Sequence, residues 1–236
     1  MKKDHNSEIT PRVIPMDNIA AIPAPWNLNG HGYIFAYRFN SDFRKNNCFL
    51  PPTIEGKVGP ISMAMIVRYD HSPVGPYDEL LFIPGYAKFN DMKNHLTISQ
   101  IFVSTTASVV NGQNNWGIPK QLANFSFNKI SDNEEHVTVS IENKVFFEAK
   151  IKTSNIGIPF NTKYIPKPLK TMAQHWDNKT FFYCPSGRSN LRPCKLLETN
   201  IDSDHFPELS QGLFLGGVKC DQFTLEFPQG TVVPKT

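Results

Sequence analysis

The sequence predicts a mainly β fold (α+β) in which a closed or sandwiched antiparallel sheet carries a few short helices. Aromatic residues make up 12% of the 236-residue chain, and 18 residues are phenylalanine, which favours strands over helical bundles. Short apolar or alternating runs recur along the chain and are separated by turn residues, whereas helical periodicity is scarce. Many short strands of this kind are typical of a closed or double-layered sheet.

The chain begins with a polar segment that becomes rich in proline before residue 26. Residues 1–25 are therefore predicted to form an N-terminal arm that docks on the rest of the protein and is not a folded element of its own. Residues 26–236 are predicted to form one domain, because a chain of this length does not require a second one.

The predicted strands are apolar or alternating segments bounded by turn residues. They cover residues 32–39, 62–69, 79–84, 96–106, 125–127, 136–142, 145–152, 181–183 and 214–227. Turns at 131–135 and 142–144 indicate a meander between the central strands. Short helices are predicted at 41–46, 120–124 and 171–176.

Charge and composition exclude several function classes. The net charge is only +3, and no run of Lys and Arg exceeds two residues, so nucleic acid is not an expected partner. The first ten residues are polar, and no apolar run has the length that a bilayer needs, so neither an export signal nor membrane binding is expected. The four cysteines show no CxxC spacing, which favours reduced thiols and a cytoplasmic location.

No metal site is predicted. Asp202, Asp204, His205 and Glu208 have metal-ligating side chains at short spacing, but they lie in a loop with a proline and without the helical context of known zinc motifs. A solvated turn is the expected structure there.

Lys120 is the first candidate for chemistry. It is the one charged residue between positions 115 and 125, where most neighbours are apolar or small. Pro119 suggests the first turn of a short helix, and both burial and the helix dipole would lower the pKa of a lysine at that place. A neutral amine is what a lysine needs to attack a carbonyl group. An ordinary surface lysine also fits this local pattern.

Glu79 is the second candidate. It follows the rigid loop Gly75-Pro-Tyr-Asp78 and opens the apolar strand at 80–83. A carboxylate at such a strand mouth is partly desolvated, which suits proton transfer. A strand-end carboxylate without a chemical role is the alternative.

These two segments together resemble the acetoacetate decarboxylase family. The segment Gly112-Gln-Asn-Asn-Trp-Gly-Ile-Pro-Lys-Gln-Leu-Ala123 is similar to the family segment that ends Pro-Lys-Lys-Leu, whose first lysine forms a Schiff base with the substrate ketone. The segment Gly75-Pro-Tyr-Asp-Glu79 matches the Gly-x-Tyr-x sequence before the family's catalytic glutamate. The resemblance gives the Schiff-base role to Lys120 and the second catalytic role to Glu79. It also implies a cone- or barrel-shaped antiparallel sheet, an oligomer and no cofactor.

The sequence departs from the family at several positions. Gln121 replaces the second lysine, Gln113 and Asn114 replace an Arg-Glu pair, and the substrate-binding arginine of the N-terminal strand has no counterpart near His31. The predicted substrate contacts are Tyr77, His31, Trp116, Gln121 and Gln113. The apolar wall around the amine is predicted from Phe35, Met63, Met65, Phe82 and Trp116.

The resemblance implies a carbon–carbon lyase that decarboxylates a 3-oxo acid or a related oxo compound through an imine on Lys120. Two alternatives remain open. One is aldol condensation or dehydration of an oxo acid, and the other is a non-catalytic pocket that binds an apolar carbonyl compound or an isoprenoid. In each case the expected partner is a small molecule. The basic pair Arg188 and Arg192 is expected to bind a substrate carboxylate or to contact another subunit.

Overall fold

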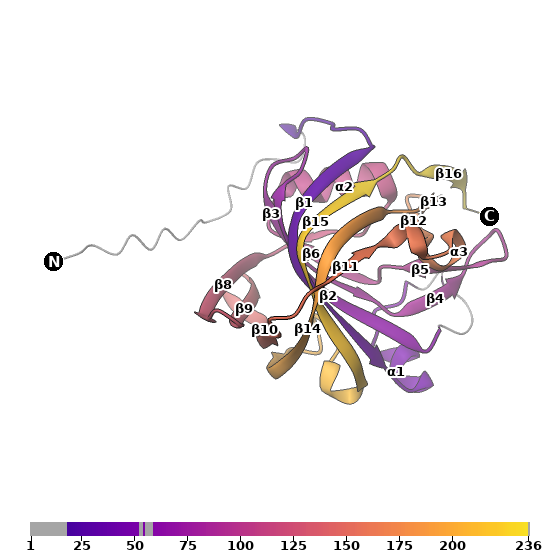
Figure 1. Cartoon of the computed structure of the whole chain (residues 1–236). Helices are drawn as coiled ribbons and strands as arrows, with labels where there is room; N and C mark the ends of the chain where they lie inside the picture. The colour runs from indigo at the N-terminus through magenta and orange to yellow at the C-terminus, as the bar shows by residue number, and fades with distance from the viewer. Residues whose placement is uncertain (1–17, 52–53, 55–58, 236) are drawn as a thin grey trace.

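The computed structural model describes residues 18–51, 54 and 59–235 (Figure 1). Residues 1–17 of the predicted N-terminal arm lie outside these residues. Residues 18–25 precede the first strand, which starts at Trp26, and the Ile22 backbone N donates to Asn111 Oδ1 at 2.7 Å. No helix in the described part of the chain is long and apolar enough to cross a membrane.

A strongly curved sheet dominates the fold. Its strands follow the spatial order β7 (Gln121–Leu122), β6 (Gln100–Val103), β3 (Tyr77–Ile83), β2 (Ile61–His71), β1 (Trp26–Arg38), β15 (Leu213–Phe227), β14 (Ser186–Ile201), β10 (Lys144–Thr153), β9 (Glu134–Ile141) and β8 (Asn124–Ser131), with β11 (Ile158–Asn161) added on β14. The long strands β1, β15 and β14 run side by side through its middle (Figure 1). The two end strands, β7 and β8, are separated in sequence by Ala123 alone, so the sheet closes almost completely into a barrel.

A smaller sheet covers one end. Its spatial order is β16 (Thr231–Pro234), β13 (Lys179–Tyr183), β12 (Met172–Trp176), β5 (Asn94–Thr97) and β4 (Gly85–Lys88). The helical elements are short: α1 (Ser41–Asn46), α2 (Thr106–Trp116), α3 (Lys167–Lys170), and the 3₁₀ turns η2 (Thr162–Tyr164) and η3 (Leu209–Gln211).

The predicted barrel-like β fold is confirmed, although the sheets are mixed and not purely antiparallel. The pairs β6–β7 and β5–β12 are parallel. The helix at 41–46 is confirmed, with the side chain of Asn40 capping its first turn. The single strand predicted at 96–106 is wrong, since the chain turns at Ile98 and Ser99 and contributes β5 and β6 to different sheets.

The helices predicted at 120–124 and 171–176 are wrong. Gln121 and Leu122 instead pair with β6, and Met172–Trp176 forms β12, because neighbouring strand edges offer hydrogen bonds that a helix of one or two turns cannot match. The prediction also missed α2, whose sequence TASVVNGQNNW contains β-branched residues, asparagines and a glycine that all disfavour helix.

Strand alternation divides the apolar residues into two cores. On β3, Leu80 and Phe82 face one core, whereas Leu81 and Ile83 face the other. Phe82 is fully buried in the first core, and we expect its truncation to alanine to cost about 3–5 kcal/mol. The second core surrounds the cavity described below.

Candidate active site

Lys120 and Glu79 form a buried ion pair. The Lys120 Nζ atom lies 2.9 Å from Glu79 Oε2, and the two side chains are only 4% and 5% exposed. A buried charge pair of this kind depends on further hydrogen bonds, because each group loses its hydration. The structure therefore brings together the two residues that the motifs singled out.

Glu79 faces the cavity because successive side chains of β3 point to opposite sides of the sheet. Tyr77, Glu79 and Leu81 point to the cavity side of this strand, whereas Leu80 packs in the opposite core. Glu79 pairs with Val67 on β2 and with Val103 on β6, so its backbone is held between two neighbouring strands. The carboxylate is thus fixed in the barrel wall.

Lys120 is positioned by the end of α2. Thr105 caps the start of the helix, and its Oγ1 accepts a hydrogen bond from the Ser108 backbone N at 3.3 Å. It stops at Gly117, which adopts a left-handed conformation with φ 64°. The chain then turns through Ile118 and Pro119, and Lys120 projects into the barrel directly before β7.

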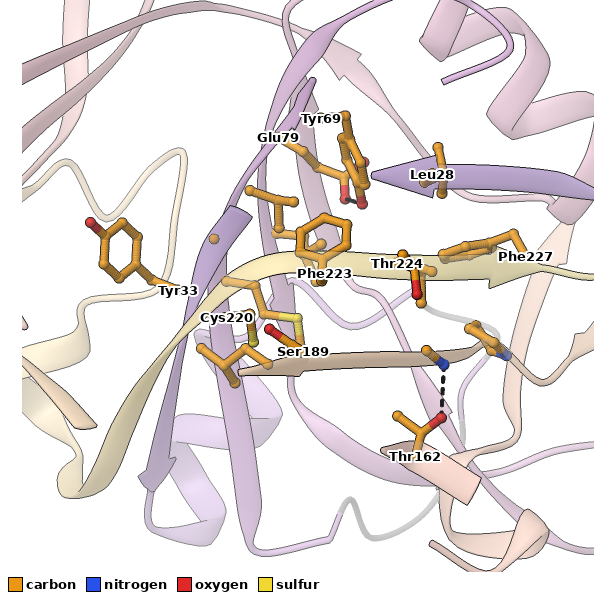
Figure 2. Close-up of a pocket in the computed structure, with 18 of the residues that line it drawn as sticks. Leu28, Tyr33, Tyr69, Glu79, Thr162, Ser189, Cys220, Phe223, Thr224 and Phe227 are labelled. Atoms are coloured by element: carbon orange, nitrogen blue, oxygen red, sulfur yellow. Dashed lines mark hydrogen bonds between the residues drawn. The ribbon is translucent and has the colours of Figure 1, made fainter. Parts of the chain in front are cut away.

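Three hydroxyl groups complete the hydrogen bonding of the pair. Lys120 Nζ donates to Ser108 Oγ at 3.0 Å and to the Tyr77 hydroxyl at 3.5 Å. The Tyr69 hydroxyl donates to Glu79 Oε1 at 3.1 Å, as Figure 2 shows. Both charged groups therefore have neutral partners in addition to each other.

The pKa of Lys120 is raised, in contrast to the predicted lowering. Burial alone lowers it, but the negative charge of Glu79 and the contacts with Tyr77 outweigh burial. The helix dipole expected at Lys120 is absent because the residue precedes a strand. Burial raises the pKa of Tyr77 to about 12, against the opposing effect of Lys120, so this hydroxyl is a proton donor at neutral pH.

A cavity of about 310 Å³ opens above the ion pair. Its wall comes mainly from β1, β2, β3, β14 and β15, and Figure 2 shows Phe223 beside Tyr69, with a ring-centroid distance of 5.7 Å. Trp116 also lines this cavity, where its ring meets that of Trp26 edge-on at a centroid distance of 5.0 Å. The arrangement offers an amine, a carboxylate and hydroxyl donors at one end of an apolar chamber.

Three of the predicted substrate contacts lie outside this cavity. His31 lies 3.6 Å from Asp70 and is absent from the cavity wall. Gln121 is exposed and donates to Gln100 Oε1 at 2.9 Å, because β7 turns its side chain outward. Gln113 supports the site from behind, with its Nε2 donating to the backbone oxygen of Lys120 at 3.2 Å.

The predicted apolar wall is partly wrong. Met65 and Trp116 line the cavity. Phe35 and Phe82 belong to the opposite core, because alternation turns them away, and Met63 packs in the second core without reaching the cavity wall.

The sequence missed Ser108 and Tyr69. Ser108 lies on the helix that was not predicted, so no signal marked it. Tyr69 lies on the same face of β2 as Met65 and Val67, and it pairs in register with Tyr77, so strand periodicity alone could have found it.

Arg188 lines the cavity but is exposed, whereas Arg192 pairs with Asp221 at 3.1 Å.

In the loop at 202–208, the Asp202 carboxylate pairs with other side chains. It lies 2.8 Å from Lys144 Nζ and 3.5 Å from His205 Nδ1. Over residues 18–51, 54 and 59–235, no cluster of three or more His, Cys, Asp or Glu side chains could hold a metal ion. All four cysteines are free thiols.

The family model described as acetoacetate decarboxylase (ADC) matches residues 10–180. Among curated protein sequences, none matches this chain significantly.

Solved structures share the fold at low sequence identity. The acetoacetate decarboxylase from Legionella pneumophila has a TM-score of 0.66 at 15% identity, over 98% of this chain and 94% of that one. An acetoacetate decarboxylase-like enzyme from Sphingomonas wittichii RW1 has a TM-score of 0.68 at 10% identity, over 96% and 99%. The enduracididine biosynthesis enzyme MppR in complex with pyruvate has a TM-score of 0.58 at 15% identity, over 92% and 94%.

Proposed function

Because the chain belongs to the acetoacetate decarboxylase family, we propose that it is a Schiff-base-forming carbon–carbon lyase that decarboxylates a 3-oxo acid or a related oxo compound through an imine on Lys120. The buried contact between Lys120 and Glu79 is the observation that supports this proposal most strongly. It supplies a nucleophile beside a base within one enclosed site.

The reaction begins with a proton transfer. In the resting enzyme the raised pKa of Lys120 keeps the amine protonated, and Glu79 Oε2 at 2.9 Å accepts this proton when a ketone displaces the ion pair. The amine lone pair then attacks the carbonyl carbon, and the oxygen leaves as water after it has gained one proton from the attacking nitrogen and one from the Glu79 carboxyl group. The product is an iminium ion on Nζ.

The iminium then accepts electrons. The bond between the carboxylate and the α-carbon breaks, carbon dioxide leaves, and the electron pair moves through the α-carbon to nitrogen to give an enamine. Protonation of the α-carbon and attack of water on the iminium return the ketone and free Lys120. Tyr77, at 3.5 Å from Nζ, is the neutral hydroxyl placed to donate a proton near the reacting carbon.

Aldol condensation with dehydration is the second candidate. MppR, which has the same fold, has also been observed with the condensation product of pyruvate and imidazole 4-carboxaldehyde. Gln121 stands where the decarboxylase sequence has a second lysine, and its side chain points away from the cavity. An enamine on Lys120 would serve this reaction as well as decarboxylation.

Borohydride trapping tests the shared imine step. The protein is incubated with 3-oxo acids, pyruvate or aldehydes, reduced and digested, and adducts are located by mass spectrometry. We expect the adduct on Lys120, none in Lys120→Met, and normal labelling in Lys129→Met, which changes an exposed lysine. Full activity in Lys120→Met would rule out the proposal. Measuring whether carbon dioxide or an aldol product is formed would separate the two reactions.

A further inference from the structure

The cavity has one polar end. Lys120 and Glu79 lie there with the hydroxyl groups of Tyr69 and Tyr77, and all four are buried. A carbonyl group that reacts with Lys120 must therefore sit at this end.

The wall that leads away from this end is mainly apolar. Thr162 and Ser189 also line it, but their hydroxyl groups already bond the Gly187 backbone N and the Asp221 backbone oxygen. Several of its side chains are only half-buried although they line the barrel interior: Ile34, Met65, Val67, Leu191, Val218, Phe223, Leu225 and Phe227. Neighbouring protein atoms leave these surfaces incompletely covered, so an apolar ligand chain that reaches them would remove further apolar area from water.

Among its described residues, the cavity wall carries no buried guanidinium that could bind a substrate carboxylate. Of the described residues that line the cavity, Lys120 and Arg188 are the basic ones. Arg188 is exposed and pairs in register with exposed Thr224, which places it at the solvent side. The part of the ligand beyond the carbonyl group therefore contacts mainly apolar side chains.

The volume also exceeds what a small oxo acid fills. An apolar cavity of about 150 Å³ accommodates one benzene molecule, so a ligand with about twice as many non-hydrogen atoms, on the order of twelve, matches this chamber of about 310 Å³.

From these observations we infer that the substrate is a ketone or 3-oxo acid with an extended apolar chain. Its carbonyl group binds at Lys120, and its chain lies along β1, β2 and β15 in contact with Ile34, Met65 and Val218. The inference rests on the proposed imine chemistry for the position of the carbonyl group, and it goes further by assigning the substrate class.

A homologous series of methyl ketones, from acetone to 2-dodecanone, isolates the contribution of the chain because the reacting group stays constant. Binding is followed by the fluorescence of Trp26 and Trp116, which line the cavity, and imine formation by borohydride trapping. We expect the dissociation constant to fall about fourfold for each added methylene until the chamber is full, and then to level off.

A constant affinity along the series, with adducts on Lys120 throughout, would overturn the substrate class while leaving the imine intact. Affinity that rises with chain length without any adduct would support an apolar ligand and overturn the proposed imine. The two failures are therefore distinguishable.

A pair of variants on β15 locates the chain. Val218→Phe narrows the apolar wall, and we expect it to weaken binding of 2-decanone at least tenfold more than that of acetone. Leu215→Phe makes a similar change on the same strand at an exposed position outside the cavity, and we expect it to alter neither. Equal losses for both ketones in Val218→Phe would contradict the assigned position of the chain.

Discussion

The side-chain stem of Lys120 crosses α2 directly over Gly112. A Cβ atom at this glycine would lie 2.7 Å from Cδ and 2.8 Å from Cε of Lys120, closer than carbon atoms pack. The absence of a side chain at position 112 therefore gives the lysine its path to Glu79.

Gly112→Ala should displace Lys120 without unfolding the protein. The new methyl group pushes the flexible stem, and we expect borohydride trapping to slow by about 10–100-fold, because a shift of about 1 Å can cost that much in a positioned reaction. The stability loss should stay below about 2 kcal/mol, because alanine offsets part of the overpacking through its higher helix propensity.

Asn114→Ala is the matched control, since it changes an exposed residue on the same helix. It should leave trapping unchanged. Equal trapping rates in Gly112→Ala and the wild type would show that Lys120 reaches Glu79 by another path.

Glu79→Gln should reverse the direction of the pKa shift of Lys120. Burial lowers this pKa and the Glu79 charge raises it, so removing the charge leaves burial dominant and moves the pKa below its ordinary value. The pH midpoint of borohydride trapping should therefore move to lower pH. An unchanged midpoint would mean that the pair is not coupled in solution.

The same variant changes how stability depends on pH. In the wild type the folded lysine holds its proton more tightly than the unfolded one, so the contribution of Lys120 is complete below about pH 10.4 and is lost as pH rises through the folded pKa. In Glu79→Gln the unfolded lysine binds the proton more tightly, so this contribution increases with pH up to the unfolded pKa. Urea titrations between pH 7 and 11, compared between the two proteins, measure the difference.

Ser108→Ala should remove one hydrogen bond that stabilises the Lys120 ammonium group. Its hydroxyl, fully buried, accepts a hydrogen bond from Lys120 Nζ at 3.0 Å, and losing a bond to a charged group costs about 1.5–3 kcal/mol. We expect a matching loss in urea-unfolding free energy and a lower pH midpoint for trapping. Ser99→Ala removes a buried hydroxyl that has no hydrogen-bond partner in the described structure and should change neither quantity. If both variants behave alike, the hydrogen bond between Ser108 and Lys120 does not contribute to the free energy of unfolding.

Asn111→Ala should release the segment before β1. Buried Asn111 accepts from the Ile22 backbone N at 2.7 Å and donates to the oxygens of Ala20 and Ala107 at 3.1 Å each. We expect a stability loss of about 1–3 kcal/mol and faster proteolysis near residues 20–22, because these backbone groups lose their partners. Unchanged proteolysis would show that the apolar contacts of Ile22 suffice to hold the segment.

Local pattern predicted many of the strands, because aromatic and alternating runs bounded by turns carry their own signal. It missed β14 (Ser186–Ile201), the longest strand, whose sequence SGRSNLRPCKLLETNI mixes polar and charged residues with a proline. It failed at α2, where caps at Thr105 and Gly117 and tertiary packing stabilise a sequence with poor helix propensity. It also failed at Lys120, whose environment depends on Glu79, a residue 41 positions away in sequence. Burial could be guessed from the apolar neighbours of Lys120, but the sign of the pKa shift required the distance between the two charges.

The junction at Ala123 has a consequence for the order of folding. Lys120 lies three residues before the seam where the first and last strands of the barrel meet, and β7 is anchored there by a two-residue parallel pairing with β6. These contacts are local in sequence, whereas the pairing of β1 with β15 joins Trp26 to Phe227 and must overcome a much larger loop-closure entropy. We therefore expect Lys120 to reach Glu79, 41 positions away, before β15 completes the barrel, so that trapping during refolding should precede protection of the amides of β1 and β15 from hydrogen exchange.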